Sequence, residues 1–286
     1  MTERTHILIL RCPDTRGIVA AVAGYLAQHS ASIVESHHFN DSVGDLFCMR
    51  TVFRADGAGM PGLAQLRSGF ELIAEGFTMT WAMHDVAVRP RVLIAVSRQG
   101  HCLFDLLHRW RAGQIAIDVV GVVSNHEEMR SFVEWNGLPY HHLPVSDANR
   151  DEQEAALLAL VHDSQVDLVV LARYMQVLSP QLCAALAGRC INIHHSFLPS
   201  FRGARPYQQA HERGVKIIGA TAHYVTTDLD EGPIIEQAVE RVTHAHTPQR
   251  LMEIGRDIEC AVLARAVRWH VERRVMLQDR RTIVFS

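Results

Sequence analysis

The sequence has no closely spaced cysteines, no long hydrophobic run and no marked excess of charge of either sign. Its six cysteines include no C-x-x-C pair, which disfavours a disulfide framework and favours cysteines that act as small hydrophobic residues in a reduced protein. No segment is apolar for long enough to be a signal peptide or a membrane span. A net charge of −3 gives no indication of a nucleic-acid partner. These absences predict a cytoplasmic protein that binds neither membranes nor nucleic acids.

Motifs for metals and dinucleotides are also missing. The 18 histidines are scattered, and adjacent pairs such as His194-His195 are expected to point to opposite faces of a strand. Such a pair is a poor two-ligand site, so the sequence predicts no metal ion. Residues 97–102 form a strand-to-helix turn with one glycine instead of G-x-G-x-x-G, which leaves a dinucleotide site unsupported. We therefore expect no cofactor.

The first 85 residues have the pattern of a ferredoxin-like βαββαβ domain. Strands are predicted at residues 6–10, 32–40, 46–53 and 77–84, and helices from residue 18 and over residues 63–75. Residues 86–90, which end in Pro90, are the expected linker. The second domain is expected to cover residues 91–286.

From residue 91 the pattern changes to apolar strands that alternate with amphipathic helices. This alternation predicts a Rossmann-like, mostly parallel sheet covered on both faces, so the chain as a whole belongs to the α/β class. Towards the end of the chain, helices are expected at residues 207–213 and 248–273, and strands at residues 215–225 and 233–239.

Residues 191–207 carry the most informative polar side chains. Asn192 and His194 fall on one face of a short β-branched strand, immediately before a loop rich in proline and glycine. Ligands of open α/β sheets bind outside the carboxyl ends of the strands, which is where these side chains would lie. Taken alone, Asn192 could instead be a turn-forming residue. His194 taken alone could be a strand-end histidine whose hydrogen bonds are all made within the fold. Asp230, beside Gly232 in the loop after the next strand, can supply a carboxylate to the same place.

Two segments, INIHHSFLPSFRGARPY at residues 191–207 and GATAHYVTTDLDEGPII at residues 219–235, resemble the formyltransferase-fold family that uses 10-formyltetrahydrofolate. The resemblance spans about residues 91–275 and implies that Asn192, His194 and Asp230 are catalytic. It also implies a set of substrate-binding residues: Met175, Gln176, Val177, Leu178, Ser196, His223, Thr226 and Thr227. Without the resemblance, the apolar members of residues 174–178 would be assigned to core packing. Arg202 and Arg205 either meet the glutamate carboxylates of the substrate or are solvated.

Asn192, His194 and Asp230 have side chains that can catalyse the hydrolysis of a formamide. When water attacks the formyl carbon, negative charge develops on the oxygen, and Asn192 and His194 can donate hydrogen bonds to it. Asp230 can orient or deprotonate the water and can hold His194 as an imidazolium.

Within this family the chain most resembles the formyltetrahydrofolate deformylases. The resemblance rests on the segments LARYMQVLSP and HHSFLPSFRGARPY and on the ACT-like domain that precedes the formyltransferase-like domain. The resemblance implies hydrolysis of 10-formyltetrahydrofolate, which supplies formate and tetrahydrofolate to one-carbon and purine metabolism. One rival is transfer to an amine acceptor, as in the glycinamide ribonucleotide transformylases. In those enzymes the turn that corresponds to residues 97–102 of this chain is smaller and receives the phosphate of the acceptor. The other rival is a non-catalytic folate or amino-acid sensor.

The segment PDTRGIV after the first strand resembles the ACT family of small-molecule regulatory domains. Gly17 would let backbone amides at the start of the helix approach a carboxylate. The resemblance implies a regulatory site of Asp14, Gly17, Ile18 and Ser32, with an amino acid as effector. Many such domains have asparagine in place of Ser32, so an oligomerisation module without a ligand is the alternative. In either case we expect a homo-oligomer.

Overall fold

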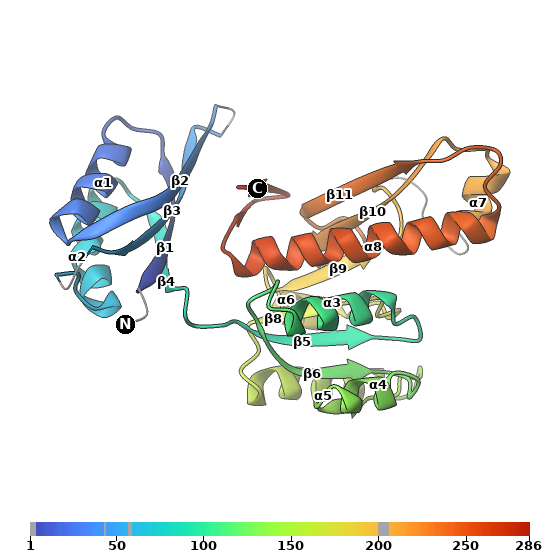
Figure 1. Ribbon diagram of the computed structural model, residues 1–286. Coiled ribbons are helices and arrows are strands. Elements are labelled where there is room, and N and C mark those ends of the chain that lie inside the picture. Colours follow the sequence, from blue (N-terminus) through green and yellow to red (C-terminus); the bar gives the residue numbers. More distant parts are fainter. Residues whose placement is uncertain (1–3, 43, 57–58, 200–205) are drawn as a thin grey trace. The chain divides into compact units, whose positions relative to one another are not determined.

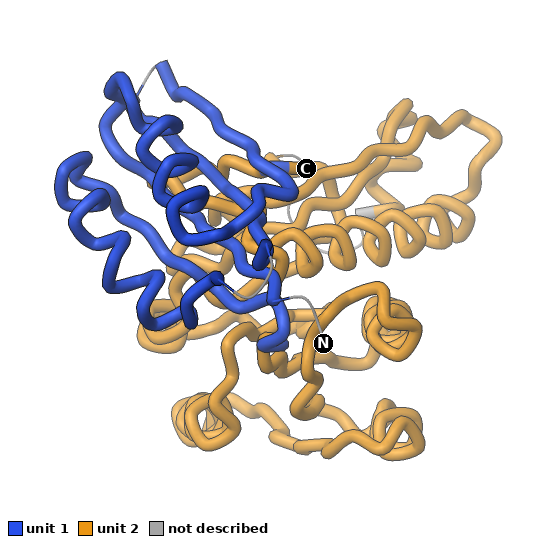
Figure 2. Tube along the Cα trace, turned by 60° about the vertical axis from the view of Figure 1, so that its left-hand side comes forward, with its two compact units in different colours: residues 1–89, 285 blue, residues 90–284, 286 orange. Residues whose placement is uncertain are grey.

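The computed structural model describes residues 4–42, 44–56, 59–199 and 206–286. The chain divides into two compact units (Figure 2): Met1–Arg89 with Phe285, and Pro90–Val284 with Ser286. None of the helices within the described ranges has both the length and the hydropathy that a bilayer span requires.

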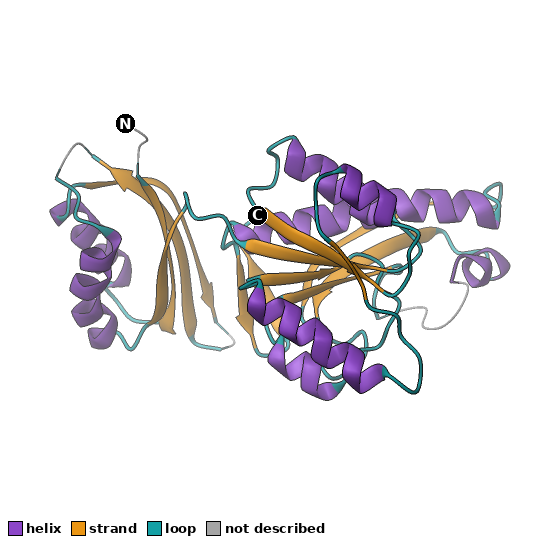
Figure 3. Ribbon diagram, turned by 90° about the horizontal axis from the view of Figure 1, so that it is seen from below, coloured by secondary structure: helices purple, strands orange, loops and turns teal. Residues whose placement is uncertain are grey.

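The first unit is a four-stranded antiparallel sheet with the strand order β2-β3-β1-β4. Two helices cover one of its faces (Figure 3), and large apolar side chains such as Leu8, Phe53 and Phe70 are fully buried between the two layers. The βαββαβ order confirms the predicted ferredoxin-like arrangement. Its elements are β1 (Thr5–Pro13), α1 (Ile18–Gln28), β2 (Ala31–Asp41), β3 (Leu46–Ala55), α2 (Leu63–Gly76) and β4 (Thr80–Asp85).

The second unit contains a seven-stranded sheet with the order β11-β10-β9-β8-β5-β6-β7. Strands β5 to β9 are parallel, whereas β10 runs antiparallel to both β9 and β11. The strand order reverses beside β5, so a topological switch point lies between β5 and β8, where open α/β sheets bind ligands. The strands are β5 (Arg91–Val96), β6 (Asp118–Ser124), β7 (Tyr140–His142), β8 (Leu168–Leu171), β9 (Cys190–His194), β10 (Ile217–Tyr224) and β11 (Ile234–Arg241).

Helices cover both faces of this sheet (Figures 1 and 3), which explains why its central strands are almost wholly apolar. In β5, Val92 and Ile94 share a core with α3 and α8, while Leu93 and Ala95 share the opposite core with α5 and α6. The mostly parallel sheet confirms the predicted fold class. The helices are α3 (His101–Arg111), α4 (Arg130–Trp135), α5 (Arg150–Asp163), α6 (Pro180–Ala185), α7 (Pro206–Glu212) and α8 (Pro248–Val271).

The end of the chain differs from the expectation. The final helix ends at Val271, two residues before the predicted end, and Arg273 has a φ of +55° that stops helical hydrogen bonding. A two-stranded hairpin then follows, β12 (Val275–Gln278) and β13 (Arg281–Val284), in which Asp279 takes a φ of +51° at the turn. The sequence pattern did not predict this hairpin, because neither strand is longer than four residues.

Candidate active site

The carboxyl end of β9 carries Asn192 and His194, and its neighbour β10 places His223 directly opposite Asn192. Asn192 Nδ2 lies 3.2 Å from His223 Nε2, and His223 Nδ1 lies 2.9 Å from the carbonyl oxygen of Tyr224. A carbonyl oxygen only accepts, so Nδ1 carries a proton, and in the neutral ring Nε2 accepts from the Asn192 amide. A bulge between Ala222 and His223 interrupts the pairing with β11 at this position. His223 therefore fixes the orientation of the Asn192 amide.

Asp230 reaches the same place from the loop between β10 and β11. Its Oδ2 atom lies 3.3 Å from His194 Nδ1, and its Oδ1 atom lies 3.7 Å from His223 Nε2. Burial opposes ionisation of this carboxyl, but the hydrogen bond from His194 outweighs burial and holds the pKa of Asp230 well below its usual range. The structure thus brings the three predicted catalytic side chains together.

Gly232 makes the close return of this loop possible. A Cβ atom at position 232 would lie 1.7 Å from the carbonyl oxygen of Tyr224 at the end of β10. No ordinary side-chain rotation relieves a collision with a backbone atom. The glycine beside Asp230 is therefore required for the carboxylate to lie at the end of β9.

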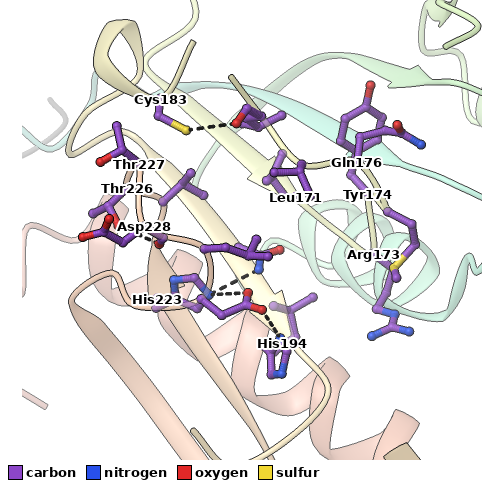
Figure 4. Close-up of a pocket in the computed structure, with 18 of the residues that line it drawn as sticks. Leu171, Arg173, Tyr174, Gln176, Cys183, His194, His223, Thr226, Thr227 and Asp228 are labelled. Atoms are coloured by element: carbon purple, nitrogen blue, oxygen red, sulfur yellow. Dashed lines mark hydrogen bonds and ion pairs between the residues drawn. The ribbon is translucent and has the colours of Figure 1, made fainter. Parts of the chain in front are cut away.

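A cavity of about 250 Å³ opens beside these residues. In Figure 4, His194 and His223 lie on one side of it, Arg173, Tyr174 and Gln176 on another, and the segment from Thr226 to Asp228 closes a third. The lining comprises Leu171, Arg173, Tyr174, Met175, Gln176, Val177, Leu178, Cys183, Asn192, Ile193, His194, His195, His223, Val225, Thr226, Thr227, Asp228, Leu229 and Asp230.

The segment after β8 gives the cavity its apolar wall. Met175 and Val177 are 58% and 51% exposed, so these two residues are not core residues, which was the alternative that the sequence left open. Leu178, in contrast, packs against the buried core below the sheet. Met175 and Val177 are consequently available to cover an apolar ring.

Side chains from elsewhere in the fold hold this segment in place. The Ser97 hydroxyl accepts a hydrogen bond from the backbone N–H of Met175 (3.0 Å) and donates one to Asn125 Oδ1 (2.7 Å). Arg150 donates to the carbonyl oxygen of Val177 (2.9 Å). Two backbone groups of the segment are thus already engaged, so a ligand must use the others. The sequence did not indicate Ser97, Asn125 or Arg150, because their role depends on contacts between distant parts of the chain.

The remaining predicted substrate-binding residues have different surroundings. Thr226 and Thr227 line the cavity, and Thr226 Oγ1 donates to the carbonyl oxygen of Asp228. Ser196 is buried and is not among the described residues that line the cavity, and its carbonyl oxygen accepts from the Thr221 hydroxyl at 2.9 Å. Arg202 and Arg205 lie outside the described residues.

The expectation that His194 and His195 point to opposite faces is wrong. Their rings stack, with centroids 4.8 Å apart and an interplanar angle of 22°. The alternation of side chains applies within a strand, and β9 ends at His194. His195 therefore lies beside His194 and belongs to the site, although the sequence did not indicate a role for it.

A buried polar cluster lies next to His195. Glu259, on α8, is 1% exposed, and its oxygens lie 2.8 Å from His101 Nε2, 2.9 Å from the Tyr207 hydroxyl and 3.5 Å from Arg173 Nε. Among the described residues, His101, Cys102 and Glu259 could offer metal ligands within 4.8 Å of one another. The Arg173 guanidinium already supplies the positive charge that a metal ion would bring, so we describe this cluster as an ion network.

The predicted regulatory residues around α1 have the expected local geometry. Gly17 precedes the helix with a φ of +95°, and no side chain caps the helix. Ile18 is 2% exposed, so only its backbone is open to a ligand. The Asp14 carboxylate accepts a hydrogen bond from Asn40 at the end of β2.

Ser32 lies at the other end of the same sheet. It pairs with Arg54, which also pairs with Thr5 at the beginning of β1, whereas Asp14 and Gly17 follow the end of β1. At about 3.3 Å per residue, the two ends of β1 are separated by roughly 26 Å. One copy of the chain thus does not bring Ser32 together with the other predicted regulatory residues.

The fold and the arrangement of Asn192, His194 and Asp230 at the end of β9 define the class of protein. Residues 90–267 match the model of the family described as formyl transferase. A glycinamide ribonucleotide transformylase of Symbiobacterium toebii superposes with a TM-score of 0.64 at 32% identity, covering 71% of this chain and 97% of its own. The family match lies wholly within the second unit.

Other relatives match almost the whole chain. A formyltetrahydrofolate deformylase of Corynebacterium sp. (strain P-1) is 53% identical over 99% of both chains. The crystal structure of a formyltetrahydrofolate deformylase from Burkholderia mallei has a TM-score of 0.94 at 53% identity and covers 99% of this chain and 100% of its own. The chain belongs to the formyltetrahydrofolate deformylase family.

Proposed function

We propose that this chain hydrolyses 10-formyltetrahydrofolate to formate and tetrahydrofolate, with water as the acceptor and without a cofactor. The observation that carries the proposal is the convergence of Asn192, His194 and Asp230 at the edge of a cavity with an apolar wall. Similarity over the full length to formyltetrahydrofolate deformylases supports the same reaction.

Each of the three residues has a role that fits its contacts. Asp230 accepts from His194 Nδ1, which stabilises the charged ring and leaves Nε2 to face the reaction. Within the described residues His194 Nε2 is buried and has no hydrogen-bond partner, so its proton is not engaged by another protein group and would be used if the substrate oxygen reaches it. The Asn192 amide, held by His223, adds a second donor.

The reaction needs one proton transfer in each direction. Asp230 orients the water and accepts its proton as the water oxygen bonds to the formyl carbon. The C–N bond to the folate then breaks, Asp230 passes the proton to the folate nitrogen, and the formic acid that leaves loses its remaining proton to solvent as formate. Met175 and Val177 cover the pterin ring in this arrangement, and Thr226, Thr227 and unengaged backbone groups of residues 174–178 contact its polar edge.

An assay for formate without any amine acceptor tests the proposal. The purified chain should release formate and tetrahydrofolate in equal amounts, and His194→Ala should release almost none. If loss of the formyl group from the folate required glycinamide ribonucleotide and released no formate, the chain would be a transformylase. Binding of the folate without formation of either product would indicate a sensor.

We propose further that residues 1–85 form an ACT-like regulatory and oligomerisation domain, joined by a linker at residues 86–90 to a catalytic domain at residues 91–286. The uncapped start of α1 can bind the carboxylate of an amino acid through its backbone N–H groups. Because Ser32 is distant from Gly17 within one chain, a ligand that contacts both must lie between two copies. This arrangement would make the expected homo-oligomer part of the regulation.

Formate release measured with and without each of the common amino acids tests this regulation. At least one amino acid should change the rate in the parent chain, and Asp14→Ala should weaken that change while the basal rate stays the same. A rate that no amino acid alters would remove the effector from the proposal. Sedimentation of the full chain would show separately whether it assembles.

A further inference from the structure

His195 is held in one protonation state by its neighbour Arg173. The guanidinium Nη1 atom lies 2.8 Å from His195 Nδ1. Because a guanidinium only donates hydrogen bonds, Nδ1 must be the unprotonated acceptor, and the single ring proton lies on Nε2. Protonation of Nδ1 would break this bond and place a second cation against the guanidinium.

Arg173 is in turn fixed by residues of three other elements. It is 9% exposed and has a φ of +65°, which directs its side chain away from the regular course of β8. Its Nη2 atom donates to Gln99 Oε1 at 3.1 Å, and its Nε atom lies 3.5 Å from the Glu259 carboxylate. His101 and Tyr207 hold that carboxylate from α3 and α7. The cation thus has a buried counter-charge and little freedom to move.

We propose that Arg173 is a positioning residue that keeps His195 neutral and so confines the positive charge of the stacked imidazole pair to His194. The proposal rests on the proposed hydrolysis, in which His194 carries the charge and Asp230 is its counter-ion. Two parallel imidazoles 4.8 Å apart cannot both be charged at low cost. A proton on His195 would therefore remove the charge from the ring that faces the formyl group.

The other charged and titratable groups around the pair agree with this assignment. Burial, reinforced by the charges of Arg173 and His194, lowers the pKa of His195 to about 4. Burial opposes ionisation of Glu259, but the hydrogen bond from His101 and the charge of Arg173 outweigh burial and keep its pKa below the usual value.

Each element that packs around His194 and His195 contributes a charged or titratable side chain. Beyond Arg173 and Glu259, these groups are Asp230 from the loop after β10, His223 from β10, His101 from α3 and Tyr207 from α7.

The pH dependence of kcat for formate release in the full chain tests the proposal. In the parent chain His195 is neutral above pH 5, so it should cause no loss of kcat between pH 7 and pH 5. In Arg173→Met, the charge of Arg173 no longer lowers the pKa of His195, so this pKa should rise toward its ordinary value of about 6.5 but stay below it, because His195 remains buried. The kcat should therefore be about threefold lower at pH 5 than at pH 7.5. An enzyme-free sample at each pH supplies the background from acid-catalysed loss of the formyl group.

Two further variants show whether this loss of kcat at low pH, the acid limb of the profile, comes from His195. The double variant R173M/H195F keeps an aromatic ring against His194 but has no titratable group at position 195, so its profile should be flat again. Arg173→Lys keeps the cation beside Glu259 and can still donate one hydrogen bond, so it should restore most of the parent profile. Arg98→Met, a change of an exposed arginine on the neighbouring turn, is the matched control and should leave the profile unchanged.

A measurement that does not depend on catalysis covers the case in which Arg173→Met fails to fold. In the parent chain labelled with ¹⁵N-histidine, the His195 signals, assigned by their loss in His195→Phe, should show a neutral ring protonated at Nε2 from pH 7 to pH 5. A charged ring or an Nδ1 proton in this range would overturn the proposal. So would a flat kcat profile in a folded Arg173→Met, or an acid limb that persists in R173M/H195F. Absence of formate at every pH would instead contradict the proposed function, while the NMR result would stand by itself.

Discussion

The two sides of His194 are built in opposite ways. On the cavity side, two loops supply side chains that are largely exposed, such as Met175 and Val177. On the other side, Arg173 and Glu259 are almost completely buried and are joined by short contacts to α3, α7 and α8. The first side can adjust to a ligand, whereas the second has no room to adjust.

This difference separates binding from control of charge. Exposed loop residues lose little when a ligand is absent, so they suit a site that fills and empties. A buried ion network keeps a fixed charge distribution, because any rearrangement would leave an unpaired charge in a medium of low polarity. His194 lies between the two sides and is the residue at which a bound substrate would meet this fixed charge. The four predictions below test this contrast.

The largest effect is expected from the catalytic side chains themselves. Asn192→Ala, His194→Ala and Asp230→Ala should each lower turnover on the order of a hundredfold or more, because each removes a donor or the carboxylate from the transition state. Steady-state formate release, with circular dichroism to verify folding, provides the measurement. Glu231→Gln removes a neighbouring charge outside the cavity lining and should retain nearly full turnover. A variant of the three with near-parent turnover would lose its assigned role.

A large loss of stability is expected on the buried side. Glu259→Met leaves Arg173 and His101 without their counter-charge, and breaking a buried ion pair in this way costs about 3–5 kcal/mol. Urea unfolding should therefore show a clearly lower midpoint. Glu253→Met, on the same helix but in an exposed pair with Arg250, should change the unfolding free energy by less than about 1 kcal/mol. Equal effects of the two variants would contradict the idea of a rigid network.

A smaller effect on binding is expected where the cavity wall is attached to the sheet. Ser97→Ala removes the hydroxyl that accepts from Met175 N–H, at a cost of about 1 kcal/mol, or roughly fivefold in KM. Because Ser97 does not contact the reacting atoms, kcat should change by less than about twofold. Ser146→Ala, an exposed serine far along the chain from the wall, should change neither constant. A fall in kcat with KM unchanged would show that the segment positions the catalytic groups instead.

The smallest effect is a pH dependence of stability that comes from Asp230. Since the folded chain lowers the pKa of Asp230, ionisation of this carboxyl stabilises the folded state at neutral pH. That contribution is present above its unfolded pKa of about 3.8 and is lost as the pH falls further. The difference in unfolding free energy between the parent and Asp230→Asn should therefore shrink between pH 6 and pH 3. A constant difference would show that ionised Asp230 gains no stability from its contact with His194.

Much of the fold could be predicted from local patterns, and the misses have physical reasons. The βαββαβ unit and the parallel sheet follow from apolar periodicity, which reflects burial and needs no knowledge of distant contacts. The hairpin of β12 and β13 lacks that signal because its strands are short. His195 was misplaced because the alternation rule was extended one residue beyond the end of β9. Arg173 and Glu259 carry no local mark, since one follows an apolar strand and the other lies within an amphipathic helix.

The class of fold, the α/β order and the importance of Asn192, His194 and Asp230 could be predicted from the sequence. These properties depend on residue spacing and on glycine and proline positions, which act over a few residues. The 3.3 Å contact between Asp230 and His194 and the orientation of Asn192 by His223 arise only in the folded chain. The same is true of the hydrogen bond from Arg173 to His195 and of the neutralisation of Arg173 by Glu259, 86 positions later. Charge control in this site depends on burial and on contacts between distant segments, and neither is encoded in the spacing of residues along the chain.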